Sequence, residues 1–199
     1  MAAPKKRVQK KTAEKKWKGK DWYIISAPDW LGGTEIASTP STDAKTVSNR
    51  VVEASVPDMM GDQGKYYMRI ALKTLAPGEN RKVSTRFHEF FCIDEYVARM
   101  ARKGLGKVAV YVDALTKDNW KIQVSVITIL NRSANAEIRA KVNVIVNEIV
   151  SGKAKEMTHG DFVKAAIAGV FQMKIKKTAS KVYPVRFCEI IKIETLKPA

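Results

Sequence analysis

Residues 108–130 read VAVYVDALTKDNWKIQVSVITIL, and this stretch decides the fold. Apolar residues alternate with others along 108–115 and again along 120–130, a period of two that is typical of β-strands with one buried face. The four residues between them, Thr116-Lys117-Asp118-Asn119, have the composition of a tight turn. The stretch therefore predicts an antiparallel hairpin.

Other strands are predicted on both sides of this hairpin, because short runs of β-branched and aromatic residues end at proline, glycine or asparagine. The run Ala76-Pro77-Gly78-Glu79-Asn80 predicts the turn between two of these strands. The predicted strands are Trp22–Ile25, a short one around Thr34–Ser38, Val51–Val56, Tyr66–Leu75, Arg81–Phe90 and Val185–Thr195.

Helical periodicity appears in three places. Cys92–Lys103 predicts a short amphipathic helix with Asp94 as its N-cap. A longer helix is predicted from about Ala136 to Lys155, because Ile138, Val142, Ile145 and Ile149 recur at intervals of four, three and four. A further helix begins at the cap residue Thr158 and continues through Val170.

We therefore expect the α+β class, with a mainly antiparallel, barrel-like sheet, several flanking helices and a disordered basic N-terminal tail. The expected division is a tail of residues 1–20 and a single domain of residues 21–199, whose helical portion covers about 136–182. A chain of 199 residues with 45% hydrophobic residues is long enough to bury a core of this size.

The charge of the chain indicates a polyanionic partner. The formal net charge is +16, and residues 1–20 contribute +8 of it, with nine basic residues against Glu14. Such a segment has little apolar surface to bury, and each lysine near a phosphate adds affinity by releasing counterions. The predicted RNA-binding residues of the tail are Lys5, Lys6, Arg7, Lys10, Lys11, Lys15, Lys16, Trp17, Lys18 and Lys20.

Further contacts are expected from the body. Arg81, Lys82 and Arg86 lie at or near alternating positions of one predicted strand, where they contact either phosphate or only solvent. The same two alternatives hold for Arg99, Arg102 and Lys103 on the polar side of the first helix. Trp17 is interpreted as a contact to RNA or protein, since an aromatic ring beside lysines stacks on unpaired bases, whereas Trp22 is expected in the core beside Ile24.

The sequence offers no catalytic motif. His88, Cys92, His159 and Cys188 are the only histidines and cysteines, and their spacing does not match a zinc site. A nucleophile elbow and a P-loop are also missing from the sequence. We therefore expect no catalytic residue, no metal ion and no cofactor. Since no apolar run of secretory or membrane-spanning length occurs, we expect a cytosolic protein without a membrane partner.

Several short motifs, in the same order along the chain, resemble the archaeal and eukaryotic small-subunit ribosomal protein S-three-A-e family, also called e-S-one. Glu89 departs from the glycine that commonly follows the family's Phe-His pair, and the tail and C-terminus are short, as in an archaeal-type member. The motifs are Lys20-Asp21-Trp22-Tyr23 with Ala27-Pro28, Asn49–Ser55, Phe87-His88 with Asp94, Ile138-Arg139, and Tyr183-Pro184-Val185 with Lys192-Ile193.

The resemblance implies a structural protein in the cytoplasm, on the platform of the small ribosomal subunit near the messenger RNA exit. It implies ribosomal RNA and neighbouring small-subunit proteins as partners, with messenger RNA near the exit as a further candidate. Two alternatives stay open from the residues alone. One is an RNA-processing enzyme with a basic arm, and the other is a nucleic-acid-binding protein that acts outside the ribosome.

Overall fold

The structure is a computed structural model that describes residues 19–198, so the predicted tail contacts from Lys5 to Lys18 lie outside the described residues. The described chain divides into two compact units. The first unit comprises residues 19–52 and 72–86, and the second comprises residues 53–71 and 87–198. The chain passes between them within β3 (Val51–Ser55), β4 (Met68–Pro77) and β5 (Lys82–Cys92).

The first unit is built on β1 (Asp21–Ser26), which pairs antiparallel with β2 (Glu35–Ser41) and parallel with the start of β5. Tyr23, Ile25, Val47 and Val83 form its small core. Three 3₁₀ turns complete the unit: η1 (Asp29–Leu31), η2 (Ala44–Thr46) and η4 (Glu79–Arg81). The buried Thr74 hydroxyl donates a 2.6 Å hydrogen bond to the Val47 carbonyl, which fixes the loop before β3 against β4.

The expectation that Trp22 fills the core is wrong. The inward face of β1 carries Tyr23 and Ile25, while the Trp22 side chain is 58% exposed. Because side chains alternate along a strand, burying Tyr23 directs its neighbour to the opposite face. Trp22 and Ile24 point to the same outer face of β1, as expected. At Trp22, however, this face is exposed to solvent and not packed in the core.

The second unit contains the hairpin predicted from residues 108–130. Strand β6 (Gly106–Leu115) pairs antiparallel with β7 (Trp120–Leu130), which pairs antiparallel with β8 (Val185–Pro198). Val112 lies opposite Val124, which lies opposite Ile193, so one apolar row crosses the three strands. Local alternation specified this part of the fold, and the prediction of the hairpin is confirmed.

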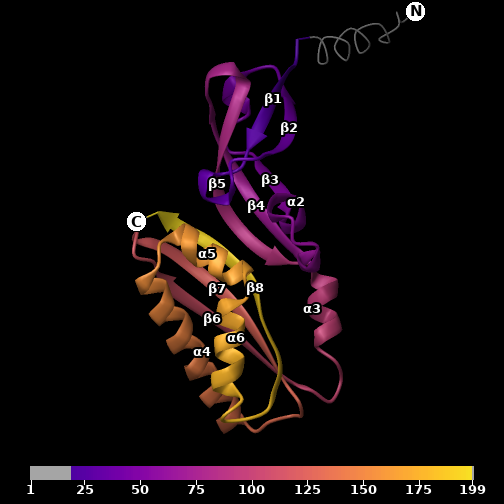
Figure 1. The fold of residues 1–199 in the computed structure, drawn as a ribbon, viewed down its shortest axis with the longest axis vertical. Helices are drawn as coiled ribbons and strands as arrows, with labels where there is room; N and C mark the ends of the chain where they lie inside the picture. Colours follow the sequence, from indigo (N-terminus) through magenta and orange to yellow (C-terminus); the bar gives the residue numbers. More distant parts are fainter. Residues whose placement is uncertain (1–18, 199) are drawn as a thin grey trace, which may run out of the picture. The chain divides into compact units, whose positions relative to one another are not determined.

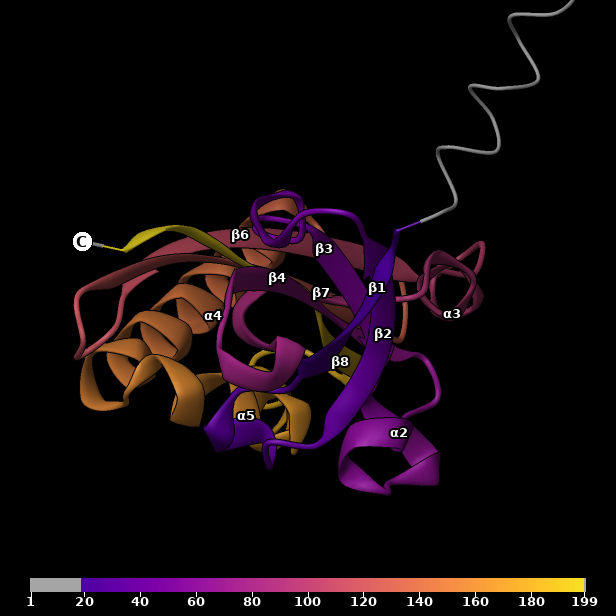
Figure 2. The same cartoon turned by 90° about the horizontal axis from the view of Figure 1, so that it is seen from above.

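Helices cover this sheet on both faces. Helix α4 (Ala136–Glu156) packs along β6 and α6 (Val170–Ala179) packs along β8, and both lie on one side of the strands (Figures 1 and 2). On the opposite face, Met100 of α3 (Asp94–Met100) packs on Ile127 and Ile129 of β7. The end of β7 is therefore buried from both sides, which explains its near-continuous apolar sequence.

Three helical details differ from the sequence predictions. The inward row of α4 is Val142, Val146, Val150 and Ala154, rather than the expected row that includes Ile145 and Ile149. The buried residues recur at every fourth position. Ile138, Ile145 and Ile149 of the predicted row are only half-buried. Ile93, not Asp94, is the N-cap of α3, and a short helix α2 (Val56–Met60) follows β3, where a strand end was expected.

The helix predicted after Thr158 is two helices. Thr158 caps α5 (His159–Ile167) as expected, with its hydroxyl accepting from the Asp161 N–H. Gly169 then takes a left-handed conformation with φ of 83°, and α6 starts at the next residue. A glycine reaches this conformation without the steric cost that other residues meet, so the chain can turn there.

The α+β class is confirmed, but the expected barrel-like closure is wrong. Among the described residues, the main strand order runs from β2 to β6 without these two end strands bonding to each other, and β4 and β3 branch from β5. In the second unit, α4 covers the apolar face of β6 that a barrel would enclose. Covering this face with a helix buries it without closing the sheet.

Candidate functional site

The predicted basic strand lies in the first unit, at the start of β5. Lys82, Ser84 and Arg86 are exposed, while Val83 and Thr85 point inward, so Lys82 and Arg86 share the solvent face. Arg81, which precedes the strand, lies 3.1 Å from the Asp21 carboxylate, and Lys82 lies 3.9 Å from that of Glu35. Exposed ion pairs of this kind are weak, about 0–1 kcal/mol, so phosphate can compete for both cations.

A more concentrated basic site lies in the second unit. Three arginines, Arg99, Arg102 and Arg186, line a pocket of about 200 Å³, which we name the arginine pocket. Its other lining residues are Tyr96, Met100, Leu105 and Phe187. Among residues 19–198, no acidic side chain lines this pocket, so the positive charge of the guanidinium groups is not balanced by the described lining.

Helix α3 supplies two of these arginines because its apolar side is fixed on the sheet. Met100 is buried against Ile127 and Ile129, and Tyr96 packs beside it as a partly buried residue. Arg99 and Arg102 are exposed, one before Met100 and one just after the helix. The sequence analysis had named both arginines as candidates for phosphate contact.

The third arginine comes from a β-bulge at the start of β8. Phe187 lies opposite Ile129 and Val185 lies opposite Leu130, so Arg186 has no residue opposite it in the ladder. Such a bulge redirects side chains, and here Arg186 and the neighbouring Phe187 are both exposed. The Arg186 guanidinium carbon lies 5.6 Å from the centroid of the Phe187 ring. A cation over an aromatic ring is favourable at this distance.

This arrangement suits a phosphate beside an unstacked base. Arginine binds phosphate through two parallel hydrogen bonds, and aromatic rings such as those of Tyr96 and Phe187 stack on bases. Tyr96, Arg186 and Phe187 were not predicted as site residues from the sequence. An Arg-Phe pair at a strand start was the available signal, but only the pairing of β8 with β7 shows that both side chains face outward.

His159 and the two cysteines of the second unit pack inside the fold. Cys92 and Cys188 are buried free thiols, and burial raises the pKa of each to about 12, which keeps them protonated and unreactive. His159 packs against Phe87 and Trp120, its ring nitrogen lies 3.1 Å from the Thr195 hydroxyl, and burial lowers its pKa. Among residues 19–198, no group of three or more His, Cys, Asp or Glu side chains is placed to hold a metal ion.

Among the helices within residues 19–198, none is both long enough and apolar enough to cross a bilayer.

The sequence of this chain is similar to those of known ribosomal proteins. Residues 8–199 match the family model described as the ribosomal S3Ae family. The small ribosomal subunit protein eS1 of Sulfolobus acidocaldarius is 30% identical over 186 residues, which cover 94% of each chain. That of Saccharolobus islandicus is 31% identical over 186 residues, covering 94% of this chain and 89% of the relative. The chain belongs to the ribosomal S3Ae family.

Proposed function

We propose that this protein is a non-catalytic structural constituent of the small ribosomal subunit. In this proposal it binds ribosomal RNA on the platform, near the exit of the messenger RNA, in the cytoplasm. Neighbouring small-subunit proteins are its other partners, and messenger RNA near the exit is a further candidate. Family membership and the similarity to eS1 proteins over 94% of the chain support the ribosomal role.

The arginine pocket is the observation that supports RNA binding most directly. It combines three guanidinium groups with two aromatic rings and has no acidic lining residue. A solvated protein surface usually mixes charges of both signs, so an all-basic lining favours an anionic partner. A phosphate held by Arg99, Arg102 and Arg186 would leave the attached base beside Tyr96 or Phe187.

The basic tail and the strand β5 are each proposed to make further contacts to RNA. The tail contributes the nine basic residues of positions 1–20, and β5 presents Lys82 and Arg86 on one exposed face. Their contacts would be to phosphate, which gives affinity without reading a base. We also retain the proposal that residues 21–199 act as a single domain on the RNA.

Sucrose-gradient fractionation of ribosomes, at moderate and high salt, tests the proposal. We expect the protein in the small-subunit fractions under both conditions. A variant with Arg99→Ala, Arg102→Ala and Arg186→Ala should leave the subunit at lower salt than the wild type. The matched control removes three exposed basic residues that do not line the pocket, by Lys117→Ala, Arg132→Ala and Arg139→Ala. Recovery of the wild-type protein only in free fractions would exclude the ribosomal role.

A further inference from the structure

A second pocket, of about 280 Å³, adjoins the arginine pocket in the same unit. It lies among the junction of α5 and α6, the start of β8, and the segment that follows the 3₁₀ turn η3 (Gln63–Lys65). Phe187 lines both pockets. Tyr67 of this pocket also stacks on Tyr96 of the arginine pocket, with ring centroids 3.6 Å apart. The two pockets are therefore joined by aromatic side chains.

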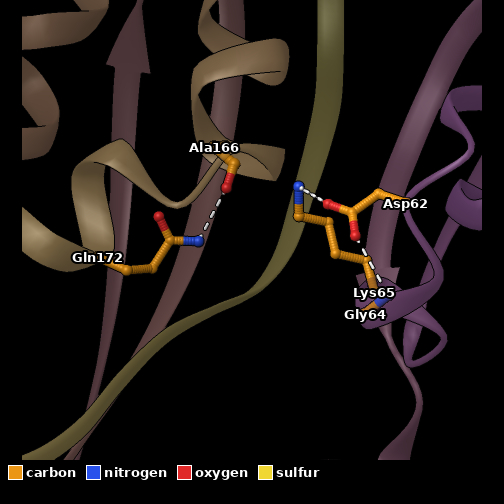
Figure 3. A network of polar contacts seen from close by, with 5 residues as sticks. All are labelled: Asp62, Gly64, Lys65, Ala166 and Gln172. Atoms are coloured by element: carbon orange, nitrogen blue, oxygen red, sulfur yellow. Dashed lines mark hydrogen bonds and ion pairs between the residues drawn. The ribbon is translucent and has the colours of Figure 1, made fainter.

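Gln172 lines this pocket, and its buried side-chain oxygen has no hydrogen-bond donor among residues 19–198. Its side chain is only 5% exposed, and its amide nitrogen donates a 2.8 Å hydrogen bond to the carbonyl of Ala166, at the end of α5 (Figure 3). This bond fixes the orientation of the amide, since the reversed one would place two oxygens together. The remaining oxygen, Oε1, has no hydrogen-bond partner within residues 19–198. A buried acceptor without a donor is unfavourable, so a ligand that donates would stabilise the site.

Glu189 supplies a second acceptor from β8. Its carboxylate is partly buried, and this burial raises its pKa to about 6, while the nearby Lys176 acts in the opposite direction. At neutral pH the carboxylate is therefore ionised and accepts hydrogen bonds through both oxygens. The side-chain oxygens of Gln172 and Glu189 are acceptors, so both are complementary to a ligand that donates hydrogen bonds.

Two lysines of the same pocket indicate that this donor is not a cationic side chain. Lys65 and Lys176 line the pocket, against the single carboxylate of Glu189. The Lys65 ammonium lies 2.7 Å from the Asp62 carboxylate, and Figure 3 marks this ion pair. Lys65 is half-buried and Asp62 is exposed, so solvent weakens the pair and a phosphate can compete for Lys65. With Asp62 beside Lys65, the charges around the pocket balance, so the lining does not favour an additional cationic side chain. Lys65 and Lys176 suit a ligand that carries a phosphate together with a neutral donor edge.

A nucleotide with an unpaired guanine base has this combination of groups. Guanine presents an N1–H and an N2 amino group on one edge, and a carboxylate accepts from both at once, whereas uracil presents a single N–H there. The second hydrogen of the amino group remains available for an acceptor such as Gln172 Oε1. The pocket also has room for more than water, since one water occupies only about 30 Å³.

We propose that this second pocket, the acceptor pocket, binds the base of an unpaired guanine in ribosomal RNA while the arginine pocket holds an adjacent phosphate. Glu189 reads the donor edge of the base, Gln172 accepts from its amino group, and Tyr67 and Phe187 contact its ring. The inference rests on the proposed RNA-binding function, and it adds a base preference that the tail cannot provide.

The test uses the full chain and two single-stranded RNA heptamers, seven uridines and the same heptamer with guanosine at its centre. Fluorescence anisotropy measures both affinities. The wild type should prefer the guanosine heptamer by about tenfold, a typical discrimination for a bidentate contact. Glu189→Gln should reduce the preference to within about twofold, since an amide presents only one acceptor oxygen. Gln172→Met, which removes the free acceptor, should also reduce it.

The matched control is Glu194→Gln, which removes a carboxylate from the same strand that pairs with Lys192 and does not line the pocket. It should keep the preference of the wild type. Equal binding of the two heptamers by the wild type would overturn the inference, as would an unchanged preference in Glu189→Gln. Displacement of bound guanosine heptamer from the wild type by guanosine monophosphate, but not by uridine monophosphate, would support a nucleotide site that reads the base. Equal displacement by the two monophosphates would overturn the inference.

Failure of this inference is separable from failure of the proposed function. If the protein comigrates with small subunits but shows no preference for guanosine, only the base-reading role of the acceptor pocket is excluded. If the protein is absent from small subunits, the ribosomal role is excluded, whatever the heptamers show.

Discussion

Replacement of Arg99, Arg102 and Arg186 by alanine should weaken the salt dependence of RNA binding by a calculable amount. The three guanidinium groups are exposed, and no acidic residue of the described chain lines their pocket, so each is placed to contact phosphate. On single-stranded nucleic acid, each phosphate contact contributes about 0.7 to the slope of log K against log salt concentration. Loss of three contacts should therefore reduce the magnitude of this slope by about 2.

The assay is filter binding of the full chain to small-subunit ribosomal RNA, from about 50 to about 200 mM KCl. Because the replaced side chains are exposed, each change should alter stability by no more than about 0.5 kcal/mol, which thermal unfolding would check. Replacement of the same three arginines by lysine should keep the slope, since the charge is retained. It should still lower the affinity, because lysine cannot form the two parallel hydrogen bonds that arginine makes.

The matched control is the triple variant Lys117→Ala, Arg132→Ala and Arg139→Ala, which removes the same charge from exposed positions outside the pocket. A pocket variant with an unchanged slope would refute phosphate contact by these arginines. Equal slopes in the pocket variant and the control would show that only total charge matters, and would refute the specific role of the pocket.

Three further predictions concern the stability of the second unit. Thr158→Ala removes the hydroxyl that accepts from the Asp161 N–H, and should lower the free energy of unfolding by about 1 kcal/mol in urea denaturation. Gly169→Ala should cost about 1–2 kcal/mol because φ is 83°, whereas Gly152→Ala, in open space within α4, should be stabilising in the same assay. Burial raises the pKa of Glu189 from 4.5 to about 6, so the folded chain binds this proton more tightly than the unfolded chain does. The ionised carboxylate therefore destabilises the fold increasingly as pH rises through this range, and Glu189→Gln should raise the melting temperature at pH near 7 but not at pH near 4. An equal shift at both pH values would contradict the assignment.

The sequence predicted those elements whose residues interact with near neighbours. The alternation in 108–130 and the helical period of 136–155 each bury one face of a single element, so a short window contains the whole signal. The same window does not show which face of β1 meets the core, and Trp22 was therefore misplaced. Gly169 was also missed as a break, because a glycine within an apolar helical pattern is compatible with either a continuous helix or a turn.

The basic pocket was predictable only in part, for the same reason. Arg99 and Arg102 were visible as basic residues on the polar side of a helix. Arg186 reaches the pocket through a bulge, and that bulge exists only because Val185 and Phe187 pair with neighbouring residues of β7, more than fifty positions earlier in the chain. The stack of Tyr67 on Tyr96 likewise depends on a contact between separate segments. Properties of this kind arise from long-range pairing, which local patterns do not encode.

These long-range contacts distinguish two parts of the proposed interface. The phosphate contacts proposed for the basic residues of positions 1–20 need no preformed geometry, so they would give affinity without a base preference. The two pockets combine residues from α3, α6, β8 and the segment before β4, and their geometry exists only when the second unit is folded. Since discrimination among bases requires donors and acceptors at fixed positions, it must come from the folded unit. In the proposed function, the tail would therefore contribute mainly to the affinity for RNA, and the folded second unit would determine the base preference.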